Sequence, residues 1–290
     1  FYSTQRIGVV NLEFWYMLTV SIVVATTAMA SGVEGATFFA PIFLILLGLP
    51  PEIAISTGLI TEVFGFASGL YAYWLKQLID YRLGLTLLSA TIPAALVGTA
   101  LSAVISPDLL RLALGSGLFV LGAYFVISAA QKHQPESTGA VSEGGRCIET
   151  QSDGVICYDK PAVWEGRVWS GIGALFMGMV STGLGEINSF FLLKRTTVPA
   201  QVAVATSVFV VAITALIASS GHVFRLSQSS PEGLATVGSL VLFTIPGVII
   251  GGQIGPLVAN RLSQSVMEKG LGILFILIGL VLLGQSLLGG

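Results

Sequence analysis

Three carboxylic acids lie inside apolar sequence, where an ionised side chain is costly unless it is paired or hydrated: Glu34, Glu62 and Glu186. Glu34 and Glu186 lie in equivalent Gly-rich segments about 150 residues apart. Ionisable groups at such positions commonly bind protons or gate a polar path, so we predict a proton-coupling or gating role for all three. Structural alternatives stay open: Glu34 and Glu186 could cap unpaired backbone amides, and Glu62 could hydrogen-bond a neighbouring helix.

Small hydroxyl and amide side chains accompany these acids in both halves of the chain. Thr57 and Thr206 are the best matched, because they occupy the same offset in the segments 50–58 and 199–207, each of which begins with Pro. A buried hydroxyl can bind an anionic oxygen, although Ser and Thr in apolar helices often only bond a carbonyl of the preceding turn. We predict solute contacts from six residues: Ser31, Thr57, Asn188, Ser189, Thr206 and Ser207.

Other chemistry finds little support in the sequence. We expect His133 and His222 in loops without companion metal ligands, and Cys147 and Cys157 alone are a weak zinc signal. No Walker sequence and no nucleophile–base arrangement can be recognised. We therefore expect no enzyme activity, no bound metal and no cofactor.

Composition identifies the medium in which the chain folds. Only 10% of the residues are charged and 54% are hydrophobic, and the mean hydropathy is +0.89. A soluble domain carries roughly a quarter charged residues, so this chain is a polytopic membrane protein. Helices are expected because a backbone exposed to lipid must satisfy its own hydrogen bonds. We predict them at about 14–31, 36–49, 53–75, 83–105, 109–130, 168–183, 187–193, 200–221, 235–259 and 266–288.

The first two apolar stretches of each half are separated by short Gly-rich segments, 31–35 (the first tip) and 181–186 (the second tip). The stretch 187–193 is too short to span a bilayer, which needs about 20 helical residues. We therefore predict that each half forms a broken or re-entrant helical hairpin followed by three transmembrane helices. The all-α fold would consist of a first repeat at 1–130, a linker loop at 131–167 and a second repeat at 168–290.

The distribution of positive charge predicts the topology. An odd number of crossings in each half places ten of the 13 Lys and Arg on one face and three on the other, whereas an even number gives eight and five. The positive-inside rule favours the odd count, which makes the halves inverted-topology repeats, with the loop cytoplasmic and the termini outside. Cys147 and Cys157 would then remain thiols. Alternation around the pair and the Asp153-Gly154 turn would fit a small β-hairpin, but we favour an ordered linker.

At both tips and at the segments that follow them, the chain resembles the TauE/SafE family of sulfite and organosulfonate exporters and permeases. The resemblance rests on residues 32–36 with Pro41 and 50–58, and on residues 183–186 with 199–207. Members usually carry a glycine cluster at the tips, which Glu34 and Glu186 interrupt in this chain. The resemblance implies a multi-pass cell-membrane permease for a small sulfur-containing anion such as sulfite, thiosulfate or an organosulfonate, driven by the proton gradient.

Taken together, these features predict a secondary transporter that works by alternating access, with its site where the two tips meet. Its partners would be a small anionic solute, protons and the lipid bilayer. A homodimer is one possible oligomeric state, and we expect no binding of nucleic acid. Three alternatives stay open: a passive anion channel, a transporter of another small organic anion, and a sensor that signals through the loop 131–167.

Overall fold

The structure of the protein is a computed structural model, and it describes residues 12–31, 34–128, 145–151, 154–259 and 264–288. It is an all-α polytopic membrane protein. Within these residues, six helices are long and apolar enough to cross a membrane: α3 (Pro51–Leu75), α4 (Tyr81–Val104), α5 (Pro107–Ser128), α8 (Ala200–Ser229), α9 (Pro231–Ala259) and α10 (Gln264–Leu288).

Shorter helices complete each half. A 3-10 turn, Leu12–Phe14, precedes α1 (Met17–Ser31), and α2 (Ala36–Pro41) continues into a π-helical turn, Ile42–Leu46. The second half opens with α6 (Val163–Val180) and α7 (Leu184–Lys194). Two broken hairpins, α1–α2 and α6–α7, are therefore each followed by three long helices, as the sequence predicted. Helix α6 begins at Val163, inside the segment 131–167 that was expected as the linker.

Proline positions explain several helix boundaries. Pro50 and Pro199 are the N-cap residues of α3 and α8, with extended backbone that cannot continue the preceding turn. Pro41 lies inside the first hairpin, where its missing N–H removes one helical hydrogen bond, and the backbone passes into the π-helical turn directly after it.

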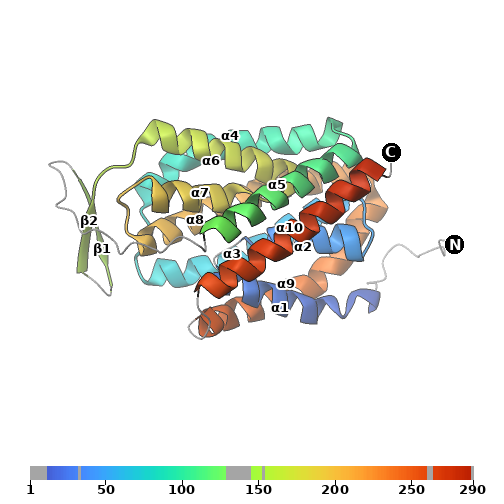
Figure 1. The fold of residues 1–290 in the computed structure, drawn as a ribbon, viewed down its shortest axis with the longest axis horizontal. Coiled ribbons are helices and arrows are strands. Elements are labelled where there is room, and N and C mark those ends of the chain that lie inside the picture. The colour runs from blue at the N-terminus through green and yellow to red at the C-terminus, as the bar shows by residue number, and fades with distance from the viewer. Residues whose placement is uncertain (1–11, 32–33, 129–144, 152–153, 260–263, 289–290) are drawn as a thin grey trace.

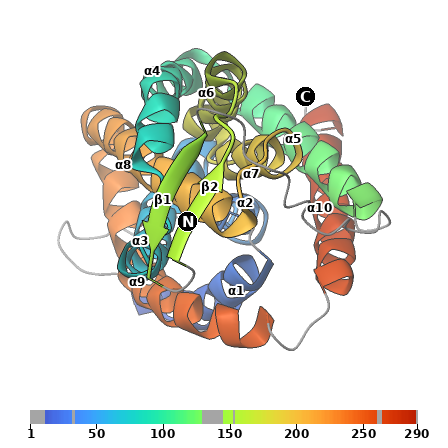
Figure 2. The same cartoon turned by 90° about the vertical axis from the view of Figure 1, so that its left-hand side faces the viewer.

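The two halves interleave in corresponding pairs. Helix α1 packs along α9 as α6 packs along α4, helix α3 contacts α9 as α8 contacts α4, and α5 packs on α10. In Figure 1, α1, α3 and α5 run toward the end of the bundle that carries the strands, whereas α6, α8 and α10 run away from it. Figure 2 shows α2 and α7 near the middle, surrounded by the longer helices.

Small residues permit these close helix contacts, and the contacts correspond between the halves. A Cβ on Gly98 of α4 would overlap the carbonyl oxygen of Leu175 on α6, and a Cβ on Gly251 of α9 would overlap that of Ile22 on α1. Threonine pairs repeat the pattern: Thr61 of α3 bonds Thr244 of α9 at 2.7 Å, and Thr91 of α4 bonds Thr214 of α8 at 2.9 Å. Packing and interhelical hydrogen bonds are what join helices in lipid.

A two-stranded antiparallel hairpin, β1 (Arg146–Thr150) and β2 (Gly154–Tyr158), lies at one end of the bundle (Figure 1). Its register places Cys147 opposite Cys157, and the two form a disulfide. The expectation that both cysteines remain thiols was therefore wrong, because the strand pairing brings their side chains together. The beginning of α1 and the end of α10 lie at the opposite end of the bundle (Figure 1).

Asp80 fastens this hairpin to the helices. Its carboxylate accepts hydrogen bonds from Tyr158 Oη at 2.5 Å and Arg146 Nη1 at 3.1 Å, and it caps α4 through the N–H of Leu83 at 2.9 Å. Burial alone would raise the pKa of Asp80, but these three bonds outweigh it and hold that pKa below its ordinary value. Burial and the Asp80 carboxylate raise the pKa of Tyr158.

A first prediction concerns the glycine contacts. Gly98→Ala and Gly251→Ala should each lower stability by about 1–3 kcal/mol, because the added methyl group must push apart two closely packed helices. Thermal unfolding of the detergent-purified protein measures the effect. Gly117→Ala on α5 is the control, since a Cβ there meets nothing within 4 Å. Equal midpoints for all three variants would contradict the packing that we describe.

A second prediction concerns the attachment of the hairpin. Tyr158→Phe removes a hydrogen bond to a charged acceptor, worth about 1.5–3 kcal/mol, so hairpin amides should exchange hydrogen faster.

The attachment should also depend on pH, because the pKa of Asp80 is lowered in the folded state. Its contribution to stability is present above the ordinary Asp value near ~4 and is lost as the pH falls through the lowered value. Hydrogen exchange followed by mass spectrometry tests both points. Exposed Tyr81→Phe should leave exchange unchanged.

Candidate solute-binding site

The two tips are places where the helical backbone is interrupted inside the bundle. Helix α6 ends at Val180, and Ser181 and Gly183 adopt left-handed conformations with φ of 62° and 112° before α7 begins. In the first tip the structure describes Glu34 and Gly35, directly before α2. A helix that begins anew has N–H groups without partners in its own first turn. Within a membrane these groups must find protein acceptors.

Glu34 supplies such acceptors to the opposite half. Its carboxylate receives the N–H of Gly183 at 3.2 Å and the N–H of Gly185, so the acid of the first tip binds the backbone of the second tip. The side chain is 2% exposed. Both of its oxygens are thus occupied, which is the amide-capping alternative that the sequence left open.

Glu186 makes the reciprocal connection. One of its oxygens accepts a hydrogen bond from Thr37 Oγ1 at 3.0 Å, and Thr37 also bonds the hydroxyl of Thr182 at 2.6 Å. The first turn of α2 is therefore linked to the second tip as well. Contacts run in both directions between the halves, and the two tips form one polar cluster.

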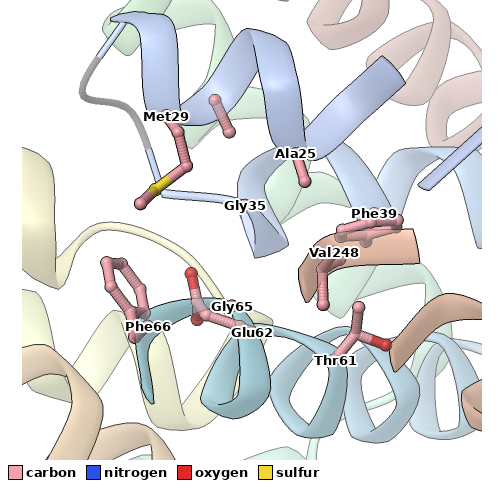
Figure 3. A pocket seen from close by; sticks show the side chains of 10 residues that line it. Ala25, Met29, Gly35, Phe39, Thr61, Glu62, Gly65, Phe66 and Val248 are labelled. Carbon is pink, nitrogen blue, oxygen red and sulfur yellow. The ribbon is translucent and has the colours of Figure 1, made fainter. Parts of the chain in front are cut away.

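Glu62 of α3 lies beside this cluster. Its Oε1 accepts the N–H of Ala36, the first residue of α2, at 3.2 Å, and its side chain is 2% exposed. A cavity of about 30 Å³ adjoins the carboxyl group, between α1, α3 and α9 (Figure 3). The three acids are close enough to interact electrostatically, Glu34 with both Glu62 and Glu186, and Glu62 with Glu186.

Several buried polar atoms at the tips have no hydrogen-bond partner among the described residues. They are Ser181 Oγ, Glu62 Oε2, Glu186 Oε2 and Asn188 Nδ2. The oxygen of the Asn188 amide is held by Ser170 Oγ at 2.6 Å, which directs its NH₂ group elsewhere. Buried polar groups are normally paired, so these atoms mark where a solute, a water or a proton could be bound.

The structure distributes the six predicted solute contacts unevenly. Asn188 is buried at the second tip, and Ser189 follows it on α7, half-buried. Ser207 is buried on α8. Ser31 is the last residue of α1, and its side chain lies outside the described part.

The matched threonines are engaged in structural hydrogen bonds. Thr57 donates to the carbonyl of Ile53 at 2.8 Å, within its own helix. Thr206 accepts the backbone N–H of Asp80 at 3.0 Å, at the hairpin end of the bundle. Gly58, next to Thr57, adjoins the second tip, where an added Cβ would lie 3.6 Å from Ser181 Oγ.

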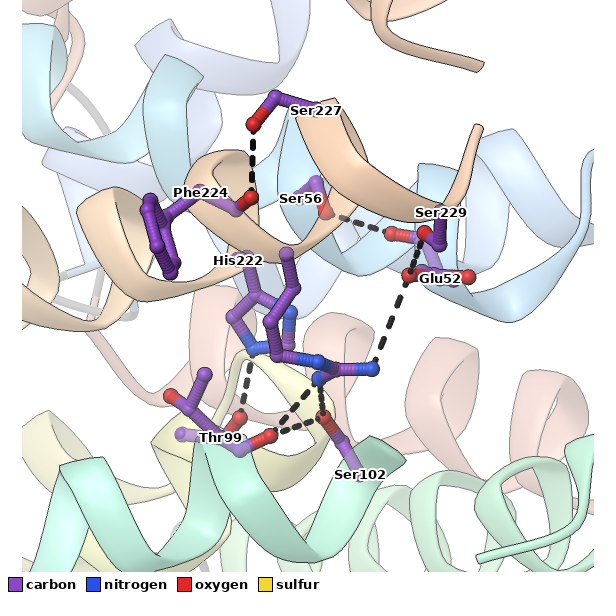
Figure 4. Close-up of polar contacts among 10 residues, drawn as sticks. Glu52, Ser56, Thr99, Ser102, His222, Phe224, Ser227 and Ser229 are labelled. Carbon is purple, nitrogen blue, oxygen red and sulfur yellow. Dashed lines mark hydrogen bonds and ion pairs between the residues drawn. The ribbon is translucent and has the colours of Figure 1, made fainter. Parts of the chain in front are cut away.

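One cationic site was missed because α8 is longer than predicted. Helix α8 continues to Ser229 instead of ending at 221, so the expectation that His222 lies in a loop was wrong. His222 is buried in the helix, with its Nε2 2.8 Å from the carbonyl oxygen of Gly178. One turn later, Arg225 donates to Thr99 O at 2.8 Å and Ser102 Oγ at 3.0 Å and lies 3.6 Å from Glu52 (Figure 4). The only sequence signal is the absence of a helix-breaking Pro before Pro231.

This arrangement can exchange hydrogen bonds and protons with a small polar solute. In the described part of the chain, no group of His, Cys, Asp and Glu side chains is arranged to hold a metal ion. Arg195, the C-cap of α7, pairs with Glu165 at 2.6 Å in a partly exposed position. His133 lies outside the described residues.

Comparison with known proteins identifies the family. The family model described as sulfite exporter TauE/SafE matches residues 17–282. The chain is 20% identical to the probable membrane transporter protein YunE of Bacillus subtilis, over 95% of this chain and 99% of that protein. It is 24% identical to the probable membrane transporter protein YjnA of the same bacterium, over 82% of this chain and 89% of that protein. No solved structure matches significantly. With its broken hairpins and long apolar helices, this chain is a membrane transporter that belongs to the TauE/SafE family.

Proposed function

We propose that the protein is a proton-coupled transporter of a small sulfur-containing anion, such as sulfite, thiosulfate or an organosulfonate, and that it works by alternating access. The substrate class comes from the family, whose model is described as a sulfite exporter. Glu34, Glu62 and Glu186 would serve proton coupling and gating. Solute would be held between the tips by the open donors of Asn188 and Ser181, with Ser31, Thr57, Ser189, Thr206 and Ser207 as the remaining predicted contacts.

The corresponding helix pairs support an inverted repeat, which is the architecture that alternating access commonly uses. Helices α1, α3 and α5 run against α6, α8 and α10 (Figure 1), and the Thr61–Thr244 bond has its counterpart in Thr91–Thr214. A rotation that exchanges the halves would exchange these contacts. Two conformations of equal packing quality, open to opposite sides, then become available to the same bundle.

The observation that carries the proposal is the pair of tips bound to each other across the halves. Glu34 holds Gly183 and Gly185, and Thr37 holds Glu186 and Thr182. Open polar atoms lie at this junction, which is where transporters built from repeats bind their cargo. Movement of one half against the other must break and remake these bonds, so cargo binding and conformation are linked.

Charge provides the reason for proton coupling. Three carboxyl groups gather around the tips, and none of the hydrogen bonds made there by the described residues comes from Lys, Arg or His. Like charges a few ångströms apart repel strongly in a medium of low dielectric constant. An anion therefore enters this site only with protons that neutralise carboxylates, and proton and anion move together.

A third prediction tests this coupling in proteoliposomes. An inwardly directed proton gradient should drive the uphill accumulation of sulfite or thiosulfate by the wild-type protein. Glu186→Gln should remove the dependence of uptake on pH. Asn188→Ala should raise KM about tenfold, since one hydrogen bond to a charged ligand is worth roughly 1.5–3 kcal/mol. Uptake that only equilibrates the solute would identify a passive channel instead.

Ser56→Ala serves as the matched control for the solute contacts. Its hydroxyl bonds only the carbonyl of Glu52 in its own helix, so KM should not change. A large effect of Ser56→Ala together with none for Asn188→Ala would show that cargo binds at α3 rather than at the second tip.

A fourth prediction concerns sidedness. We propose that the hairpin end is cytoplasmic, because the predicted crossings assign ten of the 13 Lys and Arg to that face. The disulfide favours the opposite side, since such bonds are rare in reducing compartments. After reduction, a membrane-impermeant maleimide should label Cys147 and Cys157 in inside-out vesicles and not in intact cells. A variant with both cysteines changed to Ser gives the background, and labelling of intact cells would reverse the assignment.

A further inference from the structure

The acids around the tips differ in how many of their carboxylate oxygens accept hydrogen bonds. Glu34 has both oxygens on backbone amides of the second tip, so its position is fixed by two donors. Glu62 has only Oε1 engaged, by the N–H of Ala36, and its Oε2 has no partner among the described residues. A carboxyl group that is 2% exposed with one open oxygen is poised to gain or lose a proton.

Glu62, which has this open oxygen, lines the cavity of about 30 Å³. Figure 3 shows the carboxyl group pointing into the space between Met29, Phe66 and Gly35. The other side chains around it are almost all apolar, and the hydroxyl of Thr61 is already bonded to Thr244. A volume of this size admits one water molecule, which needs polar partners to stay, and Glu62 is the polar group that faces it.

We propose that Glu62 and this cavity form a proton-binding site separate from the cargo site, in which one water hydrates the carboxylate and delivers the proton. The inference rests on the proposed function for its consequence, which is coupling to cargo, but not for proton binding itself. Glu34 then acts in gating as the link between the tips, and Glu62 is a group whose charge changes during transport.

The surroundings of Glu62 favour a change of charge at this position. Among the described residues, the acidic groups that face it are Glu34 of the first tip and Glu186 of α7. The stretches of α1 and α9 that line the cavity contribute Ala25, Ala28, Met29 and Val248, and none of these is charged. Every neighbouring charge is thus of the same sign, so protonation of one acid depends on the state of the others.

The bond to Ala36 connects this proton to the tips. An ionised Glu62 accepts the N–H of Ala36 through a charge-assisted hydrogen bond, and a protonated carboxyl accepts it more weakly. Ala36 directly precedes Thr37, which is bonded to Glu186 and Thr182 of the other half. Protonation therefore loosens the start of α2, the element that contacts the cargo site.

Infrared difference spectra of the purified protein between acid and neutral pH test the site without any cargo. One component of the C=O band of protonated carboxyl groups should be lost in Glu62→Gln and kept in Glu34→Gln, while the exposed Asp and Glu contribute equally to all spectra. Retention of the full wild-type band in Glu62→Gln would overturn the proposal. Absence of transport by the wild type would reject the proposed function and leave this result intact, so the two failures are distinguishable.

Gly65→Ala provides a second variant that keeps the carboxyl group. An added Cβ would lie 3.8 Å from Val248 Cβ, an ordinary contact, so the variant should fold while its methyl group displaces the water. Removing this hydration should shift the pH midpoint of the infrared band, and of uptake, by about one unit. Gly117→Ala, where a Cβ meets nothing within 4 Å, should shift neither. Identical midpoints in Gly65→Ala and the wild type would overturn the role of the cavity.

Discussion

The constraint on which the structure depends is that a helix broken inside a bilayer must find partners for its exposed backbone amides. The chain meets this requirement across the two halves, since Glu34 of the first half receives the amides of Gly183 and Gly185 in the second. A local cap would have stabilised each tip separately. Because the acceptor comes from the opposite half, the interface between the halves and the stability of the tips depend on the same hydrogen bonds.

The helices around the tips are joined by contacts that suit sliding or rocking. Glycines bring backbones together at Gly98 and Gly251, and single threonine pairs join α3 to α9 and α4 to α8. Such contacts are close but chemically simple, and interhelical hydrogen bonds in membranes contribute only about 1 kcal/mol each. The ends of the bundle differ, because Asp80 with Arg146 and Tyr158 lies at one end and Arg225 with Glu52 at the other.

Much of the fold was predictable, because span length and apolar composition determine where helices lie, and Gly-rich breaks with adjacent acids located both tips. The site was predictable only in part. Matched spacing selected Thr57 and Thr206, but that spacing reports the proline-defined starts of α3 and α8 and not the direction in which a hydroxyl points. Arg225 and the disulfide were missed, since helix length past 221 and strand register are set by tertiary packing.

The corresponding helix contacts of the two halves are not matched by a corresponding distribution of charge, and under the proposed coupling this difference sets a direction. At the positions of α8 that correspond to Glu62, residues 211–215, the chain carries only Val, Ala, Ile and Thr. The start of α2 is thus held by Glu62 of its own half, whereas the start of α7 is held by Glu34 of the opposite half. If both starts were held alike, protonation would loosen both equally and favour neither conformation. Under our proposal, a proton on Glu62 acts on the start of α2 and biases the equilibrium between the two conformations.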